Sequence, residues 1–148
     1  MSLVDQINSD STAAMKAGEA DKLSVLRLAK TALMNKKIEL GHDLSDDEAI
    51  AVLAKEAKQR RDSEAEFRAA NRPELADKEA AEAQMLVTYL PAQMDESAVA
   101  QLVDAAIAET GAAGAADMGK VMGALMPKTR GKADGALVSR LVKERLGA

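Results

Sequence analysis

Helical periodicity runs through nearly the whole chain, and no alternating strand pattern competes with it. The 148 residues include one Phe, one Tyr and no Trp, so the core has to be built from Leu, Val, Ile, Met and closely approaching helices. Such a composition favours helices over sheets. We therefore predict an all-α fold, in a chain long enough for one domain or two small ones.

Helix start and stop signals divide the first part of the chain into four segments. Ser45 and Glu48 form a capping box, in which the hydroxyl and the carboxylate satisfy free amides at a helix start. Pro73 suits the first position of a helix, which tolerates its missing amide. We expect an N-terminal bundle of about four helices, over roughly Leu3 to Ala17, Asp21 to Leu40, Ser45 to Ala70 and Pro73 to Tyr89.

The dipeptide Leu90-Pro91 is the expected domain boundary, because proline disfavours a helical residue before it. We assign residues 1–90 to the helical bundle and residues 91–148 to a small C-terminal three-helix domain. The expected features of this second domain are a helix from the cap Asp95 to Thr110, a linker over 112–116, a helix capped by Asp117 and ended by Pro127, and a last helix capped by Asp134.

Charge is distributed unevenly along the chain. Residues 117–148 carry seven basic and three acidic side chains, a net charge of +4, whereas the other 116 residues carry 13 basic and 21 acidic side chains, a net charge of −8. A basic end on an acidic chain favours a polyanionic partner there. The candidate RNA- or phosphate-binding residues, which we name the terminal basic set, are Lys120, Lys128, Arg130, Lys132, Arg140 and Lys143.

Apolar residues in the same segment are spaced for helix packing. They are expected to form the core between the last two helices, and they are Met118, Val121, Met122, Leu125, Leu137, Val138, Leu141 and Val142. Gly119 and Gly123 lie four residues apart on a neighbouring face, where each costs about 1 kcal/mol relative to alanine. Close approach of another helix is the ordinary explanation, and contact of this backbone with RNA is the functional one.

The loop 128–133 contains three cations and one glycine just before a helix N-terminus. Free amides and the helix dipole favour anions at such a position, which makes the loop a candidate phosphate site. Asp134 opposes this interpretation by adding a carboxylate at the same helix start. A solvated loop without a ligand explains the pattern equally well.

Two weaker basic clusters occur in the first domain. Arg27, Lys30 and Lys37 share one face of the second segment and form a candidate secondary basic face. The other cluster lies on the third segment, where acids four residues after Lys58 and Arg60 favour ordinary ion pairs within one helix, Lys58 with Asp62 and Arg60 with Glu64. The full cluster consists of Lys55, Lys58, Arg60 and Arg61.

No catalytic or metal-binding constellation is found in the sequence. The chain has no Cys and a single histidine, His42, in a turn beside Asp43, so we expect no catalytic residues, no metal and no cofactor. Phe67 and Tyr89 are the aromatic residues that could stack on bases, and both are expected in the core. The first twenty residues have no apolar run, which favours a cytoplasmic protein without a membrane span.

Long stretches of the chain resemble the YqeY-like proteins, a family of small helical bacterial proteins that share a domain with the tail of the B subunit (GatB) of tRNA-dependent amidotransferases. The resemblance covers LRLAKTALMNKKIEL at 26–40, AKEAKQRRDSEAEFRAANRPELADKEAAE at 54–82, YLP at 89–91 and DMGKVMGALMPKTRGKADGALVSRLVKERL at 117–146. It implies an N-terminal helical bundle and a C-terminal domain similar to the GatB tail, which helps to engage tRNA. Asp134-Gly135 departs from the Asn-Pro expected in many GatB tails.

The resemblance implies a role with RNA rather than catalysis by this chain alone. The family is associated with carbon-nitrogen ligase activity that uses glutamine as amide donor, but the ATP-dependent body of GatB and the Gly/Ser-rich amidase motif are both missing from these 148 residues. The leading hypothesis is an accessory module that binds tRNA or other structured RNA. The alternative is an adaptor that docks on an amidotransferase, an aminoacyl-tRNA synthetase or another translation factor.

Overall fold

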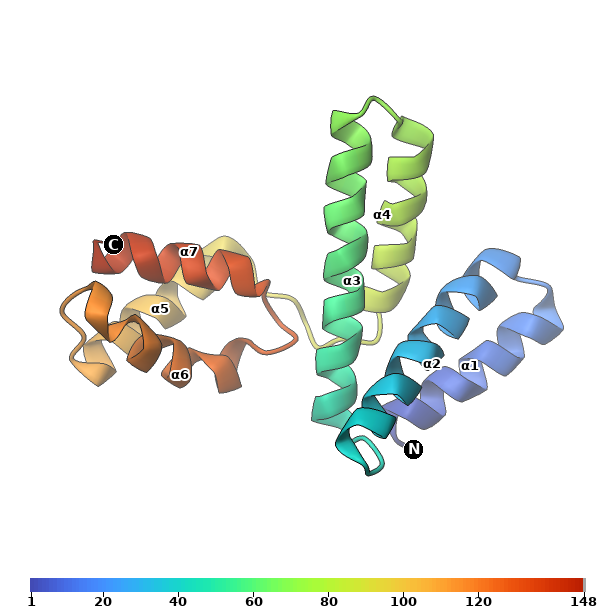
Figure 1. The fold of residues 1–148 in the computed structure, drawn as a ribbon, viewed down its shortest axis with the longest axis horizontal. Coiled ribbons are helices and arrows are strands. Elements are labelled where there is room, and N and C mark those ends of the chain that lie inside the picture. The colour runs from blue at the N-terminus through green and yellow to red at the C-terminus, as the bar shows by residue number, and fades with distance from the viewer. Residues whose placement is uncertain (148) are drawn as a thin grey trace. The chain divides into compact units, whose positions relative to one another are not determined.

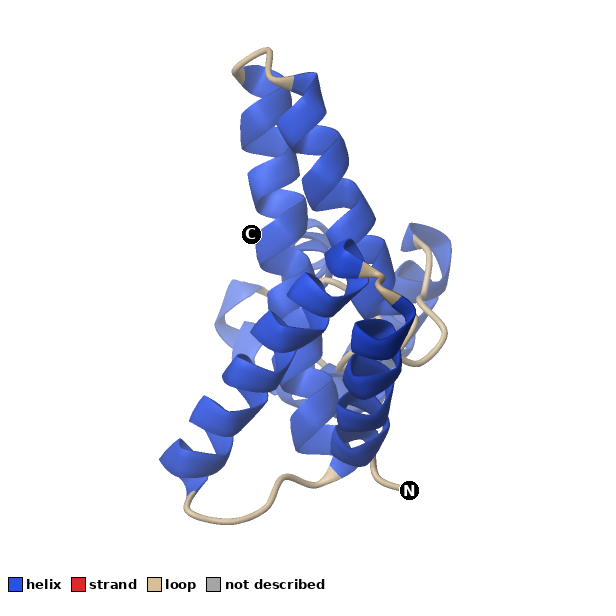
Figure 2. Ribbon diagram, turned by 90° about the vertical axis from the view of Figure 1, so that its right-hand side faces the viewer, coloured by secondary structure: helices blue, strands red, loops and turns tan. Residues whose placement is uncertain are grey.

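A computed structural model describes residues 1–147 of the chain, and all of their regular structure is helical (Figures 1 and 2). The predicted all-α class is therefore confirmed. The chain divides into two compact units, Met1–Leu90 and Pro91–Ala148. The elements are α1 (Leu3–Ala17), α2 (Ala20–Leu40), α3 (Asp46–Ala69), α4 (Pro73–Val87), α5 (Glu96–Thr110), the short 3-10 helix η1 (Ala115–Asp117), α6 (Met118–Thr129) and α7 (Gly135–Leu146).

Most helices begin or end at the residues that the capping signals of the sequence predict. Asp95 accepts a hydrogen bond from the amide of Ala98 at 2.7 Å and begins α5. Gly18, Gly41 and Gly111 end their helices with φ near +70°, a conformation that glycine adopts without the Cβ penalty of other residues. Glycine is thus the residue that these C-caps require.

Two expectations about α6 were wrong. Pro127 does not end the helix, which continues to Thr129, because proline has a helical φ and removes only its own amide donor. The carbonyl that loses this donor belongs to exposed Gly123, where water can replace it. Asp117 stands at the N-cap position of α6, but its side chain makes no cap bond and instead accepts from the amide of Ala113 at 2.9 Å.

The first unit contains two antiparallel helix pairs, α1 with α2 and α3 with α4 (Figure 1). Its apolar core lies where these pairs meet, and Ile7, Leu26, Leu53 and Leu86 are fully buried in it. Tyr89 packs against this core and donates a hydrogen bond from its hydroxyl to Asp10 Oδ2 at 2.6 Å. The bond links the end of the first unit to α1.

The half of the α3–α4 pair nearest its connecting turn extends away from α1 and α2 (Figures 1 and 2). Arg60 lies in the middle of α3 with only 8% of its surface exposed. Its Nη1 donates to Glu56 Oε2 at 2.9 Å, and its Nε lies 3.5 Å from Glu82 Oε2 on α4. The expected Arg60–Glu64 pair was wrong, since Glu64 accepts from Arg68, whereas Lys58 does pair with Asp62 at 2.9 Å.

The second unit packs α5, α6 and α7 around a core of its own. The stripe expected on the last two helices lies in this core: Val121, Leu125, Val138, Leu141 and Val142 are buried, and Met118, Met122 and Leu137 are partly buried against them. Helix α5 contributes Val99, Val103 and Ala106. The stripe therefore holds the unit together and leaves the opposite faces of α6 and α7 for contact.

Candidate nucleic-acid interface

The terminal basic set is exposed along α6, the following loop and α7. Lys120 and Lys128 lie on α6, Arg130 and Lys132 lie in the loop, and all of these residues face solvent. The two cations of α7, Arg140 and Lys143, are exposed as well, on the side opposite its buried residues. The structure thus keeps the whole set available at the surface, although its members differ in what they contact.

Acidic residues of α5 pair with cations of α6 and α7. Lys128 Nζ lies 3.7 Å from Glu109 Oε2, and Arg140 Nη2 lies 3.0 Å from Glu96 Oε1. Arg145 is not in the candidate set, and its Nε lies 2.9 Å from Asp104 Oδ1. The second unit carries seven basic and seven acidic residues in all, so its net charge is zero. The positive charge of 117–148 is therefore balanced by its own unit.

Arg140 is held by two carboxylates at once. In addition to Glu96, it donates from Nη1 to Glu144 Oε1 at 3.0 Å, one turn further along α7. These hydrogen bonds raise the pKa of Arg140 above its ordinary value, and the bond with Glu96 has the larger effect. The side chain is exposed, so the pairs are screened by solvent and salt, and a phosphate can compete for the guanidinium.

Four members of the set have no acidic partner among the described residues: Lys120, Arg130, Lys132 and Lys143. We name them the unpaired cations. Their charges are not neutralised by a neighbouring carboxylate at ion-pair distance. They are therefore the cations most available to a polyanion, because a phosphate binding to them displaces no internal ion pair.

Backbone contacts fix the loop between α6 and α7. Gly131 takes a φ of +73°, and its carbonyl accepts a hydrogen bond from Gln93 Nε2 at 2.7 Å. The carbonyl of Lys132 accepts from the amide of Met94 at 2.8 Å. Gln93 and Met94 precede α5, and this role was not recognised in the sequence because it depends on contacts some 38 residues apart. The loop is thereby anchored at two adjacent carbonyls.

The helix start beyond this loop already has an anionic cap. Asp134 Oδ1 accepts from the amide of Ala136 at 2.9 Å, so one of the free amides of α7 is satisfied by the protein. A phosphate seated at these amides would meet the Asp134 carboxylate. The side chains of Arg130 and Lys132 are thus better suited to phosphate contact than the amides at the start of α7.

The glycine face of α6 is open. A Cβ atom built on Gly119 or Gly123 would meet nothing within 4 Å in the described part of the chain, and both residues are exposed. The expected close approach of another helix is therefore wrong for residues 1–147. Lys120 follows Gly119 directly and is also exposed.

The secondary basic face divides into two parts. Lys30 and Lys37 line one hollow beside the start of α1, whereas Arg27 lines another with Leu23 and Leu28. Lys37 Nζ is paired with Asp43 Oδ1 at 2.7 Å, which leaves Arg27 and Lys30 without acidic partners in the described chain. Lys37 lowers the pKa of the Asp43 carboxyl below its ordinary value, mainly through their hydrogen bond and then through its positive charge.

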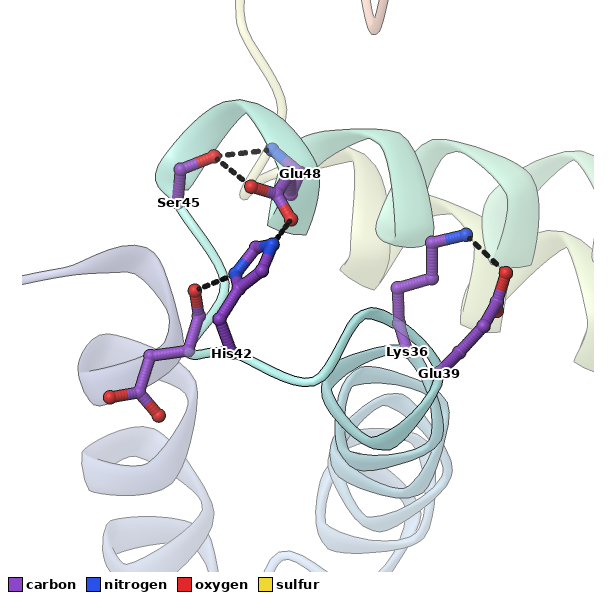
Figure 3. A network of polar contacts seen from close by, with 6 residues as sticks. Lys36, Glu39, His42, Ser45 and Glu48 are labelled. Carbon is purple, nitrogen blue, oxygen red and sulfur yellow. Dashed lines mark hydrogen bonds and ion pairs between the residues drawn. The ribbon is translucent and has the colours of Figure 1, made fainter.

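The turn containing His42 is organised as a cap (Figure 3). Ser45 Oγ accepts from the amide of Glu48 and donates to Glu48 Oε1, so half of the expected capping box forms. His42 Nδ1 donates to the carbonyl of Asp43 at 2.7 Å, and its Nε2 lies 3.8 Å from Glu48 Oε2. These contacts order the start of α3.

The aromatic residues differ in their surroundings. Tyr89 packs against the first core as expected, but Phe67 is only partly buried and belongs to neither apolar core. Within residues 1–147, no group of His, Asp and Glu side chains is placed to hold a metal ion. The helices formed by these residues are also too short or too polar to cross a bilayer.

Residues 4–146 match the model of a family described as Yqey-like protein, which agrees with the resemblance noted in the sequence. The comparison with curated proteins returned no match. The family match spans both compact units.

Proposed function

Because the chain belongs to the YqeY-like family, we propose that it is an accessory module that binds tRNA or other structured RNA through its second unit. The observation that carries the proposal is the exposure of the four unpaired cations, Lys120, Arg130, Lys132 and Lys143, in a unit that pairs its other cations. Recognition depends on phosphates and RNA shape, since neither unit offers exposed aromatic rings in a row for base stacking.

Salt dependence gives the first measure of this interface. With about four phosphate contacts, the affinity for tRNA should fall on the order of a hundredfold between 50 and 200 mM salt. Fluorescence anisotropy of labelled tRNA, titrated with the protein at several KCl concentrations, measures both the affinity and the slope.

Charge reversal locates the contact. In the double variant Arg130→Glu, Lys132→Glu, two contacts are lost, so the slope of log affinity against log salt should fall by about 2. The matched control is Lys16→Glu, Arg61→Glu, which changes the net charge equally on exposed residues of the first unit. Equal weakening by the two double variants would remove the proposed interface, since the effect would then come from net charge alone.

The acids of α5 provide an independent test, in which the salt dependence of RNA binding should increase rather than decrease. Glu109→Gln releases Lys128 from its ion pair, and Glu96→Gln leaves Arg140 paired with Glu144 alone, without adding a charge to the contact surface. Each freed cation that reaches a phosphate should steepen the salt slope by about 1. An unchanged slope and affinity in the double glutamine variant would show that α6 and α7 do not face the RNA.

A further inference from the structure

Helix α2 has an exposed row of side chains, two of them apolar, that the first unit does not cover. Arg27, Thr31, Met34 and Ile38 follow each other at spacings of four, three and four residues, and at 3.6 residues per turn they share one side of the helix. We name this row the α2 seam. Ile38 is 71% exposed and Met34 is 55% exposed, whereas Val25 and Ala29 on the opposite side are buried.

Hollows lie on both sides of the seam. One of about 570 Å³ lies between α2 and α3 and is lined by Leu28, Ala32 and Val52 among others. The other, of about 500 Å³, lies towards the start of α1 and includes Met34 and Leu33 in its lining. A ridge between two grooves is the surface into which the side chains of a second helix can interlock.

The charge of α2 indicates the character of that second helix. Residues 20–40 carry five basic and two acidic side chains, a net charge of +3, in a unit that carries 13 basic and 17 acidic side chains. Arg27 in the seam and Lys30 beside it have no acidic partner within residues 1–147, and both are exposed. A partner that buries the apolar side chains without neutralising these two cations would leave charge unpaired at the contact.

We propose that the α2 seam docks an acidic amphipathic helix of a partner protein. Its apolar side chains pack along Met34, Ile38 and the hollow beside Leu28, and its acids face Arg27 and Lys30. The inference concerns the first unit and does not depend on RNA binding by the second. It is favoured over RNA because phosphates gain nothing from the exposed Met34 and Ile38, and over a bilayer because a lipid surface does not fill two separate grooves.

The test is a selection from displayed helical peptides on the full-length protein. The peptides are about three heptads long, with a fixed seam of Leu and Ala and with flanking positions randomised among Glu, Gln and Lys. We expect enrichment of Glu at the flanking positions. Enrichment of Lys, or no enrichment, would overturn the proposal.

Variants of the protein then assign the binding to the seam. Arg27→Glu with Lys30→Glu, and separately Met34→Ser with Ile38→Ser, should each weaken the selected peptide by at least about tenfold. Met15→Ser is the matched control, since Met15 is as exposed as Met34 but lies on α1, and it should change the affinity by less than about twofold. Thermal melts check that the variants fold.

Two further probes separate the other occupants. One probe is labelled tRNA and the other is vesicles that contain phosphatidylserine. Each probe is titrated separately with the wild type and with both α2 double variants. The proposal requires that neither probe loses binding in these variants beyond the loss seen with Lys16→Glu, Arg61→Glu. Binding of vesicles or tRNA that disappears only in the α2 variants, or peptide binding that Met15→Ser weakens equally, would contradict it.

Discussion

Arg60 is a nearly buried charged side chain whose loss should destabilise the first unit. Its guanidinium is nearly buried between α3 and α4, and the carboxylates beside it, Glu56 and Glu82, have only 20% and 16% of their side chains exposed. Arg60→Met keeps an unbranched apolar stem and removes the guanidinium with its charge. The two acids then share a partly dry site with no cation between them.

The distances set the scale of the effect. At an effective dielectric constant of about 20, the 2.9 Å contact with Glu56 is worth about 6 kcal/mol and the 3.5 Å contact with Glu82 about 5 kcal/mol of gross attraction. The latter is electrostatic, since Nε of Arg60 makes no hydrogen bond. Desolvation of the three groups offsets most of this in the native protein, and losing one partner leaves that cost uncompensated. We expect Arg60→Met to lower the free energy of unfolding by about 3–5 kcal/mol.

The chain offers a probe specific to the unit concerned. Tyr89 is the single tyrosine, there is no tryptophan, and this residue packs on the first core, so tyrosine fluorescence in urea follows the unfolding of the first unit. Arg61→Met is the matched control, because Arg61 is the exposed neighbour on the same helix. Its effect should stay within about 0.5 kcal/mol.

A rescue experiment separates charge from packing. Adding Glu56→Gln and Glu82→Gln to Arg60→Met removes the two unpaired charges and should recover most of the loss. A single variant that costs less than about 1 kcal/mol would refute the electrostatic argument. A triple variant as unstable as the single one would also refute it, since the loss would then lie in the packing.

Three further outcomes follow from local contacts. Tyr89→Phe should cost about 1.5 kcal/mol in urea denaturation followed by circular dichroism. Burial and then the hydrogen bond to Asp10 raise the pKa of the Tyr89 hydroxyl, so the folded state holds the hydroxyl proton more tightly than the unfolded state. In wild type, the resulting stabilisation of the folded state is complete below pH 10 and should be lost as the pH rises above 10. Lys37→Met should return the lowered pKa of the Asp43 carboxyl towards 3.8, as measured by NMR titration. In wild type, the Lys37–Asp43 ion pair stabilises the folded state above pH 3.8, and this stabilisation should be lost as the pH falls below 3.8. Gly111→Ala should cost about 1 kcal/mol in a thermal melt, because φ is +68° and no atom crowds the site.

Features set by nearby residues were predictable from the sequence. The ends of α1, α2 and α5 follow from glycines that take positive φ, and the start of α7 follows from the Asp134 cap. The apolar stripes of α6 and α7 follow from helical spacing alone. Such signals act over one or two turns, so a single sequence contains them in full.

Features that depend on distant residues were not predictable in this way. The pairing of Lys128 with Glu109 joins two helices, and no spacing rule points from one to the other. Arg60 has acids four residues away on either side, but it pairs with Glu56 and lies 3.5 Å from Glu82 of α4, while Glu64 pairs with Arg68. The open face at Gly123 is also a tertiary property, because the sequence shows a cost in the helix but not whether a neighbour compensates it.

Helix α5 carries three acids that reach the cations of its neighbours and carries no cation itself. It therefore acts as a built-in counterion for the second unit. A substitution on α5 can raise or lower the attraction of the unit for a polyanion while every residue of the contact surface, and the core beneath it, stays the same. Under the proposed function, the affinity for RNA would then depend on acids that lie outside the proposed contact surface.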